Sequence, residues 1–180
     1  VASLQWTEKY APEGIDEVVG NPSAIAELKN WAANWNPGKK PLLLVGPPGT
    51  GKTASALALA KTMGWEVLEM NASDQRNKQN VEHVAGLASV SATFSGGKRL
   101  ILLDEIDGML KEDRGGASAV VKVIKESRNP IILTANDEYA NSLKTIRQYC
   151  KVVKFKKIHY GTIKNRLKEI CLAEGIDFDE

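Results

Sequence analysis

A glycine-rich stretch of this chain has the residue types and spacing of a phosphate-binding loop. Residues 46–53 fit the pattern G-x-x-x-x-G-K-[ST] without deviation. Glycines permit a tight turn whose amide N–H groups converge on an anion, and a following helix adds the positive end of its dipole. Lys52 can reach the β- and γ-phosphates of a nucleoside triphosphate, and the Thr53 hydroxyl can ligate Mg²⁺. The predicted nucleotide-binding residues of the loop are Gly46, Pro47, Pro48, Gly49, Thr50, Gly51, Lys52 and Thr53.

Acidic residues follow a second apolar run, where they can serve a metal ion and a water molecule. Residues 100–103 are wholly apolar and lead into the acidic run at 104–107. Ligands of open α/β sheets gather at the carboxyl ends of the strands, so these acids are expected beside the phosphate loop. Asp104 is predicted to hold Mg²⁺ together with Thr53, and Glu105 to orient and deprotonate the attacking water. Taken alone, such acids are equally compatible with stabilising a helix N-terminus, and the phosphate loop favours the catalytic interpretation.

A neutral polar side chain follows a third apolar run. Residues 131–133 lead into Thr-Ala-Asn-Asp at 134–137. The Asn136 amide is predicted to hydrogen-bond the attacking water or an oxygen of the γ-phosphate, completing a catalytic set with Lys52 and Glu105. Asn is also a common turn residue, so its position, not its type, indicates the function.

Short apolar runs alternate with amphipathic stretches along the chain, which is typical of βαβ units. We predict strands at residues 41–45, 66–70, 100–103, 130–134 and 151–155. We predict helices at residues 22–35, capped by Asn21, and at 51–63, 77–90, 117–124 and 160–174. Five strands with intervening helices predict an α/β fold with a parallel, doubly wound sheet. Lysines at the margins of 151–155 favour the border of the sheet for that strand.

Composition limits the class of protein without choosing its partners. The chain has 180 residues, 43% of them hydrophobic, which suits one domain or one domain and the start of another. A net charge of +2 neither requires nor excludes nucleic acid. Cys150 and Cys171 lack disulfide-framework or zinc-site spacing, and Cys171 is predicted to lie in the core. No apolar run is long enough to span a bilayer, so we expect an intracellular protein without a membrane partner, cytoplasmic in a prokaryote and nuclear in a eukaryote.

Together these motifs resemble the AAA+ ATPases and, more narrowly, the replication factor C clamp loaders. The similar segments are the N-terminal box at 6–12 and 16–20, a box at 70–76 uncommon outside that family, a Walker B motif at 104–108 and a sensor-1 segment at 134–137. The resemblance covers almost the whole chain. It implies a P-loop NTPase of the AAA+ type that uses ATP and Mg²⁺. It also implies a nucleotide-binding domain at 1–157, followed at 158–180 by the first helix of a truncated helical lid domain.

The resemblance further implies an activity and partners. Clamp loaders are hetero-oligomeric arcs with small subunits that use ATP to open a sliding clamp and load it on primer–template DNA. The N-terminal box of relatives lies against the nucleotide base, which implies an adenine pocket lined by Tyr10, Pro12, Val18 and Val19. Two alternatives remain: another AAA+ motor, such as a Holliday-junction helicase or a protein-remodelling ATPase, and a nucleotide-binding scaffold without useful hydrolysis.

Contacts with DNA and with the clamp are implied for two further segments. DNA contact is implied for Arg114, Gly115 and Gly116, although an ordinary loop capped by Asp113 is equally compatible. Clamp contact is implied for Val90 and Phe94, for which burial in the core is the commoner outcome.

Two segments bear on the type of subunit. Residues 112–116 resemble the large subunit of clamp loaders. Small subunits carry Ser-Arg-Cys where this chain has Gln148-Tyr149-Cys150, and their arginine reaches into a neighbour's ATP site. The nearest arginine here is Arg147, whose role the resemblance leaves open. A large subunit without this arginine finger is therefore implied. The resemblance also implies that a neighbouring subunit would supply the arginine finger for this chain's own site, so the isolated chain is expected to hydrolyse ATP slowly.

Overall fold

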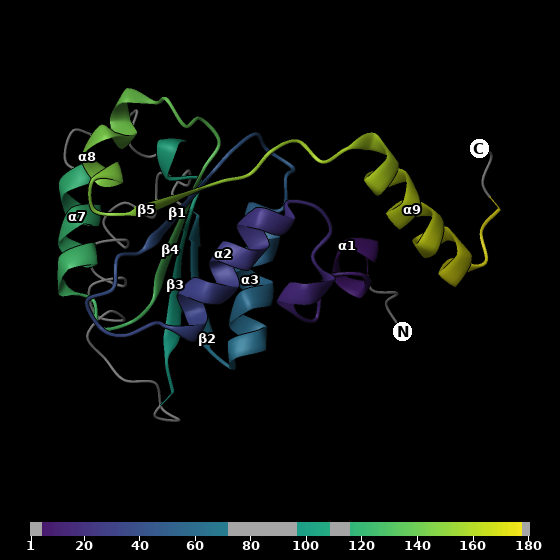
Figure 1. The fold of residues 1–180 in the computed structure, drawn as a ribbon, viewed down its shortest axis with the longest axis horizontal. Coiled ribbons are helices and arrows are strands. Elements are labelled where there is room, and N and C mark those ends of the chain that lie inside the picture. The colour runs from purple at the N-terminus through teal and green to yellow at the C-terminus, as the bar shows by residue number, and fades with distance from the viewer. Residues whose placement is uncertain (1–4, 72–96, 109–115, 178–180) are drawn as a thin grey trace.

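A parallel sheet with helices on both faces forms the centre of the molecule (Figure 1). The computed structural model describes residues 5–71, 97–108 and 116–177. The strands are β1 (Leu42–Val45), β2 (Glu66–Asn71), β3 (Arg99–Asp104), β4 (Ile131–Ala135) and β5 (Lys151–Lys154). The longer helices are α2 (Pro22–Ala33), α3 (Lys52–Met63), α7 (Gly116–Glu126) and α9 (Tyr160–Glu174). Shorter elements are α1 (Trp6–Lys9), α8 (Lys144–Arg147) and the 3-10 turns η1 (Ile15–Glu17) and η4 (Asn141–Leu143).

The order of the strands decides which loops meet. The sheet runs β2-β3-β4-β1-β5, and every neighbouring pair is parallel. The predicted five-stranded parallel sheet flanked by helices is therefore confirmed, as is the border position of β5. Because all strands point the same way, the loops that follow β1, β3 and β4 emerge along one edge.

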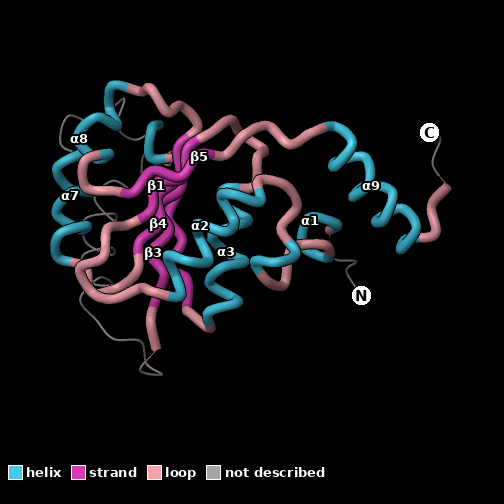
Figure 2. The backbone as a smooth tube through the Cα atoms, in the orientation of Figure 1, coloured by secondary structure: helices cyan, strands magenta, loops and turns pink. Residues whose placement is uncertain are grey.

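The wholly apolar strands divide their side chains between two cores. In β1, Leu42 and Leu44 belong to a cluster that includes α2 and α3, whereas Leu43 and Val45 belong to a cluster that includes α7 and α8. Figures 1 and 2 show these two helix pairs on opposite faces of the sheet. The three leucines are fully buried, and each such burial contributes about 1.5–3 kcal/mol. A strand covered on both faces has no polar side, so β1 is apolar throughout.

Helix α2 begins where its sequence predicts, but its cap differs from the expectation. Asn21 occupies the N-cap position and Pro22 the first helical position, as predicted. However, the Asn21 side chain makes no capping hydrogen bond, and its backbone is left-handed with φ of 49°. The helix ends at Ala33, and Trp35 beyond it still packs into the core.

Helix α9 extends away from the sheet (Figure 1), which makes the prediction of a buried Cys171 wrong. None of its residues is buried, Leu167 of its apolar stripe is 54% exposed, and Cys171 is only half-buried. Apolar helical spacing predicts a face that packs, but among the described residues no element covers this one. The two-domain division at 157/158 stays a prediction, and the helix expected at 77–90 lies outside the described residues. No described helix combines the length and the apolarity needed to cross a membrane.

Candidate functional site

The glycine-rich loop turns sharply between β1 and α3. Gly46, Gly49 and Gly51 all have positive φ values, of 153°, 72° and 89°. A Cβ atom at Gly46 would lie 2.2 Å from the carbonyl oxygen of Phe155, so no side chain fits there. Glycine is therefore required at Gly46 both by conformation and by the close approach of the chain that follows β5.

Lys52, the first residue of α3, is folded into the loop that it closes. Its Nζ donates hydrogen bonds to the carbonyl oxygens of Gly46 at 2.7 Å and Pro47 at 2.9 Å, and to Asn136 Oδ1 at 3.1 Å. The residue is only 6% exposed. Burial lowers the pKa of Lys52, while the charges of Asp104, Asp107 and Glu105 act in the opposite direction. A buried cation is costly without an anion, so the site favours a negatively charged ligand.

Asp104, at the end of β3, is held by two threonine hydroxyls. Thr53 Oγ1 donates to Asp104 Oδ1 at 2.8 Å, and Thr134 Oγ1 donates to the same oxygen at 2.5 Å. A hydroxyl and a carboxylate are hard oxygen ligands, the kind that Mg²⁺ takes in small number when phosphates supply the rest. Thr134 was not among the predicted site residues. Its position at the end of β4, two residues before Asn136, was the signal that sequence analysis overlooked.

Glu105 follows β3 in a conformation that is unusual for a residue with a side chain. Its φ is 53°, in the left-handed region, and its backbone N–H donates to Thr134 Oγ1 at 3.0 Å. Such conformations cost of order 1–3 kcal/mol and are concentrated at functional sites. Thr134 therefore supports both the carboxylate of Asp104 and the strained turn at Glu105.

Asp107 positions the end of β4. Its Oδ2 accepts backbone N–H groups of Asn136 and Asp137, each at 3.1 Å, and the residue is 6% exposed. The second oxygen, Oδ1, is buried without a hydrogen-bond partner among the described residues. Asp107 belongs to the acidic run at 104–107, and the local sequence does not indicate its separate role because its partner is a backbone 29 residues away. Through Asn136, whose side chain meets Lys52, Asp107 links the β3 loop to the phosphate loop.

The predicted phosphate, metal and catalytic residues surround one open cavity of about 190 Å³. Its lining residues are Pro48, Gly49, Thr50, Gly51, Lys52, Thr53, Ala54, Asp104, Glu105, Thr134 and Asn136. The structure thus brings together side chains from the ends of β3 and β4 with the glycine loop that follows β1. Gly46 and Pro47 are not in this lining, and their carbonyl oxygens instead hold the Lys52 ammonium.

The residues expected at the adenine lie outside the lining of this cavity. Tyr10 donates its hydroxyl to Glu174 of α9 at 2.6 Å, and this hydrogen bond raises the pKa of Tyr10. The Pro12 carbonyl oxygen lies 3.5 Å from Lys61 Nζ, and Val18 packs against the core beneath α2 and α3. Val19 is half-buried. The adenine pocket therefore stays a prediction.

The remaining predicted contacts fall mostly outside the described residues. Val90, Phe94, Arg114 and Gly115 all lie there, while Gly116 is buried at the start of α7. Arg147 donates to the Glu138 carbonyl oxygen at 2.9 Å, and its guanidinium lies 3.7 Å from the Glu138 carboxylate.

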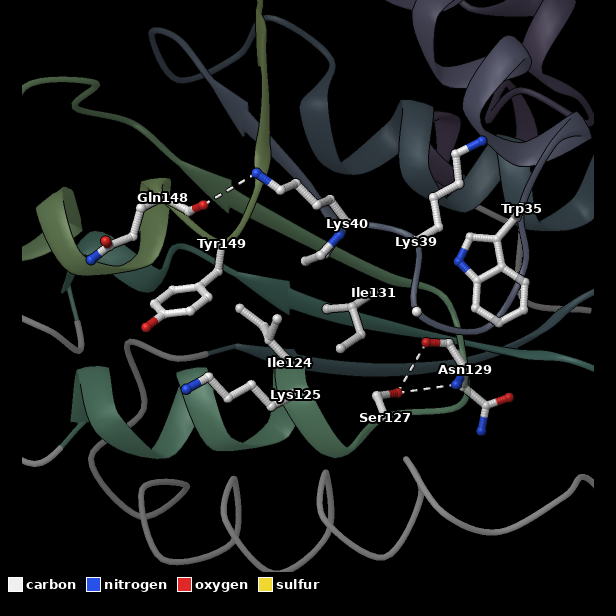
Figure 3. Close-up of a pocket in the computed structure, with 12 residues that line it drawn as sticks. Trp35, Lys39, Lys40, Ile124, Lys125, Ser127, Asn129, Ile131, Gln148 and Tyr149 are labelled. Carbon is white, nitrogen blue, oxygen red and sulfur yellow. Dashed lines mark hydrogen bonds between the residues drawn. The ribbon is translucent and has the colours of Figure 1, made fainter.

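A larger cavity, of about 250 Å³, opens at the opposite edge of the sheet (Figure 3). It lies between the chain entering β1 and β4 and the turn before β5, and its walls include Trp35, Lys40, Lys125 and Tyr149. None of the predicted site residues lines it, and no carboxylate is found among its described lining residues. Of these two cavities in the described structure, only the smaller one is lined by both the glycine loop and the acidic residues, which are the groups that a metal-bound triphosphate requires.

Comparison with known proteins gives consistent matches. The family model for "ATPase family associated with various cellular activities (AAA)" matches residues 42–156. The chain is 48% identical over 176 residues to the "Replication factor C large subunit" of Methanothrix thermoacetophila, covering 96% of this chain and 38% of that protein. Proteins of the same name are 47% identical over 180 residues in Methanococcus aeolicus (98% and 38% covered) and 46% identical over 175 residues in Methanocorpusculum labreanum (96% and 37% covered). The chain therefore spans less than two fifths of the length of these relatives.

Proposed function

The chain belongs to the AAA family of ATPases, and from this premise we propose that it is the ATP-binding and ATP-hydrolysing module of a sliding-clamp loader's large subunit. The observation that carries the proposal is the convergence of Lys52, Thr53, Asp104, Glu105 and Asn136 on one cavity beside the glycine loop. Similarity to proteins named replication factor C large subunit supports the narrower assignment.

In this proposal the five converging side chains bind phosphate, orient the water or hold the metal ion. The loop amides and Lys52 bind the β- and γ-phosphates, and Asn136 meets the γ-phosphate or the attacking water. Glu105 orients that water and accepts its proton. Thr53 and Asp104 would hold Mg²⁺, which when bound neutralises charge on the phosphate oxygens. Among the described residues no cluster of three or more His, Cys, Asp or Glu side chains could hold a metal, so phosphate and water would complete its shell.

The proposed partners are clamp-loader small subunits, the sliding clamp and primer–template DNA. They follow from the name that the similar proteins carry, which describes a subunit of a replication factor. Such a protein would act inside the cell, where the DNA is. The proposed adenine pocket is lined by Tyr10, Pro12, Val18 and Val19; in support, Asn21, which follows this segment, hydrogen-bonds the phosphate loop. Slow turnover is expected of the isolated chain because an arginine finger for its ATP site would have to come from a neighbouring subunit.

The nucleotide site is tested by replacing Lys52 with Ala. A charged hydrogen bond contributes about 1.5–3 kcal/mol, so the affinity for a fluorescent ATP analogue should fall by about tenfold to more than a hundredfold. Lys61→Ala is the matched control, because Lys61 lies on the same helix, is exposed and does not line the cavity; among the described residues its ammonium contacts the exposed Glu13 and the Pro12 carbonyl oxygen. Equal affinities of the two variants would contradict the proposed site.

Hydrolysis is tested separately with Glu105→Gln. This variant keeps the shape of the side chain and removes its basicity, so ATP should bind normally while turnover falls at least a hundredfold. The measurement uses the full-length protein assembled with small subunits, clamp and primer–template DNA. Equal DNA-stimulated turnover of variant and wild type would show that Glu105 is not the catalytic base. Absence of turnover in both would favour the alternative of a nucleotide-binding scaffold.

A further inference from the structure

The side chain of Asn21 joins two segments that are distant in the sequence. Its Nδ2 donates to the carbonyl oxygen of Thr50 in the phosphate loop at 3.3 Å and to that of Lys156 at 3.0 Å. Its Oδ1 accepts the backbone N–H of Lys156 at 2.7 Å. Lys156 lies in the linker between β5 and α9, so one amide group holds both the phosphate loop and this linker.

Both the type and the conformation of this residue are required for the arrangement. Asn21 has φ of 49° and ψ of 50°, a left-handed conformation that Asn tolerates better than most residues. Its amide acts as donor and acceptor at once, which a carboxylate at this position cannot do. The usual role of an N-cap side chain, bonding the first amides of the helix, is not fulfilled here.

The linker also packs closely against the glycines on either side of this contact. A Cβ atom at Gly20 would lie 2.9 Å from Ile158 Cγ1, and one at Gly46 would lie 2.2 Å from the Phe155 carbonyl oxygen. The linker therefore touches the N-terminal segment and the phosphate loop along residues 155–158. At the far end of α9, Glu174 forms an ion pair with Lys9 at 2.5 Å. The N-terminal segment thus contacts both ends of the linker–α9 unit.

Holding the Thr50 carbonyl has a direct consequence for the loop. A peptide group is planar and trans, so its C=O and N–H point in opposite directions. A Thr50 carbonyl that faces Asn21 therefore directs the Gly51 N–H away from Asn21, and Thr50 and Gly51 both line the 190 Å³ cavity. The Asn21 contact selects one orientation of this peptide group.

We propose that Asn21 is a positioning residue that fixes the phosphate-loop peptide at Thr50 and couples nucleotide binding to the linker that leads to α9. The proposal rests on the nucleotide site proposed above. Because coupling between two sites is reciprocal, a nucleotide that orders the loop also strengthens the hydrogen bonds to Lys156, and a loosened linker weakens nucleotide binding.

The test compares Asn21→Gly with wild type in two measurements on the full chain. Glycine accepts the positive φ, so this variant removes the side-chain hydrogen bonds without adding backbone strain. Affinity for a fluorescent ADP analogue with Mg²⁺ should fall about tenfold, the effect of losing roughly one net hydrogen bond. In wild type, nucleotide should slow amide hydrogen exchange at Lys156 at least threefold, and in Asn21→Gly this response should disappear.

Two further variants make the result specific. Asn34→Gly is the same substitution at the other end of α2, where the side chain bonds only Asn30 among the residues that the structure describes, and it should behave as wild type. Asn21→Asp keeps the acceptor for the Lys156 N–H but loses the hydrogen bonds donated to the carbonyl oxygens of Thr50 and Lys156, so it should also weaken nucleotide affinity. This variant replaces Asn21→Gly in the test if the glycine variant does not fold.

The outcomes separate the two proposals. Wild-type protein that binds no nucleotide contradicts the proposed function. Wild-type protein that binds, with Asn21→Gly or Asn21→Asp binding equally well, or with the exchange response at Lys156 intact, overturns the role of Asn21.

Discussion

The most informative perturbation is the removal of the buried Asp107 carboxylate. Asp107 accepts two backbone N–H groups, from Asn136 and Asp137, and is 6% exposed. Asp107→Ala leaves both donors without this partner, whereas Asp107→Asn keeps an acceptor oxygen and loses the charge. The two variants therefore separate the geometry of the contact from its electrostatic part.

The magnitude follows from the two hydrogen bonds. Each bond to a charged acceptor contributes about 1.5–3 kcal/mol, so Asp107→Ala should lower the free energy of unfolding by about 3 kcal/mol or more. Asp107→Asn should cost about 1 kcal/mol. For a domain of this size about 3 kcal/mol corresponds to a fall in Tm of roughly 6–12 °C. Because Asn136 would lose its fixed position, turnover in the assembled complex should fall more than nucleotide affinity.

The assay is urea unfolding followed by tryptophan fluorescence and circular dichroism. Asp16→Ala is the control, since Asp16 is an exposed acid whose ion pair with Lys29 should contribute less than about 1 kcal/mol. If Asp107→Ala unfolded within about 0.5 kcal/mol of this control, the contact to β4 would not stabilise the fold and the reasoning would be refuted.

Three other predictions concern the same contacts. Gly46→Ala should lower the free energy of unfolding in urea by at least about 3 kcal/mol, because its Cβ atom would clash with the Phe155 backbone. Gly64→Ala is the control: Gly64 also has a positive φ but has open space around it, so this variant should lose only about 1 kcal/mol. Equal losses in the two variants would contradict the clash. Burial raises the pKa of Cys150 to about 12, so at pH 8 a thiol reagent should modify Cys171 in the native protein and Cys150 only after unfolding; rapid modification of native Cys171→Ser would contradict this. The hydrogen bond from Lys9 lowers the pKa of Glu174, so the stabilisation that this contact gives α9 is present above the carboxyl's ordinary pKa and is lost as pH falls through the lowered value. The protection of the α9 amides from hydrogen exchange, relative to their intrinsic rates at each pH, should then fall, and Glu174→Gln should abolish this pH dependence.

Local signals in the sequence were sufficient to predict most of the strands and helices and the phosphate loop. The spacing of residues 46–53, with an apolar run before them and a helical stretch after, predicted the loop and the start of α3 within one residue. Unbroken apolar runs predicted buried parallel strands, because a strand covered on both faces has no polar side. The lysines of β5 predicted its place at the border of the sheet.

The apolar periodicity of α9 led to a wrong prediction, because the described part of the structure contains no element that packs against this helix face. The apolar stripe of α9 predicted a buried Cys171, yet no residue of that helix is buried. An apolar face states only that a helix can pack, and the surrounding elements decide whether it does. The left-handed Asn21 is a similar case, because the capping signal located the start of α2 but not the use of the side chain.

The sequence by itself determined the chemistry that this chain carries: a glycine turn, a lysine, a threonine and the acids and amide that follow apolar strands. Only the tertiary structure decided that Thr134 and Thr53 share the Asp104 carboxylate, that Asp107 holds Asn136 and that Asn21 bridges Thr50 and Lys156. The physical reason is the range of the interactions. Turns, caps and apolar patterns depend on neighbours within a few residues, whereas these contacts depend on the tertiary fold, which brings together segments 29 to 135 residues apart.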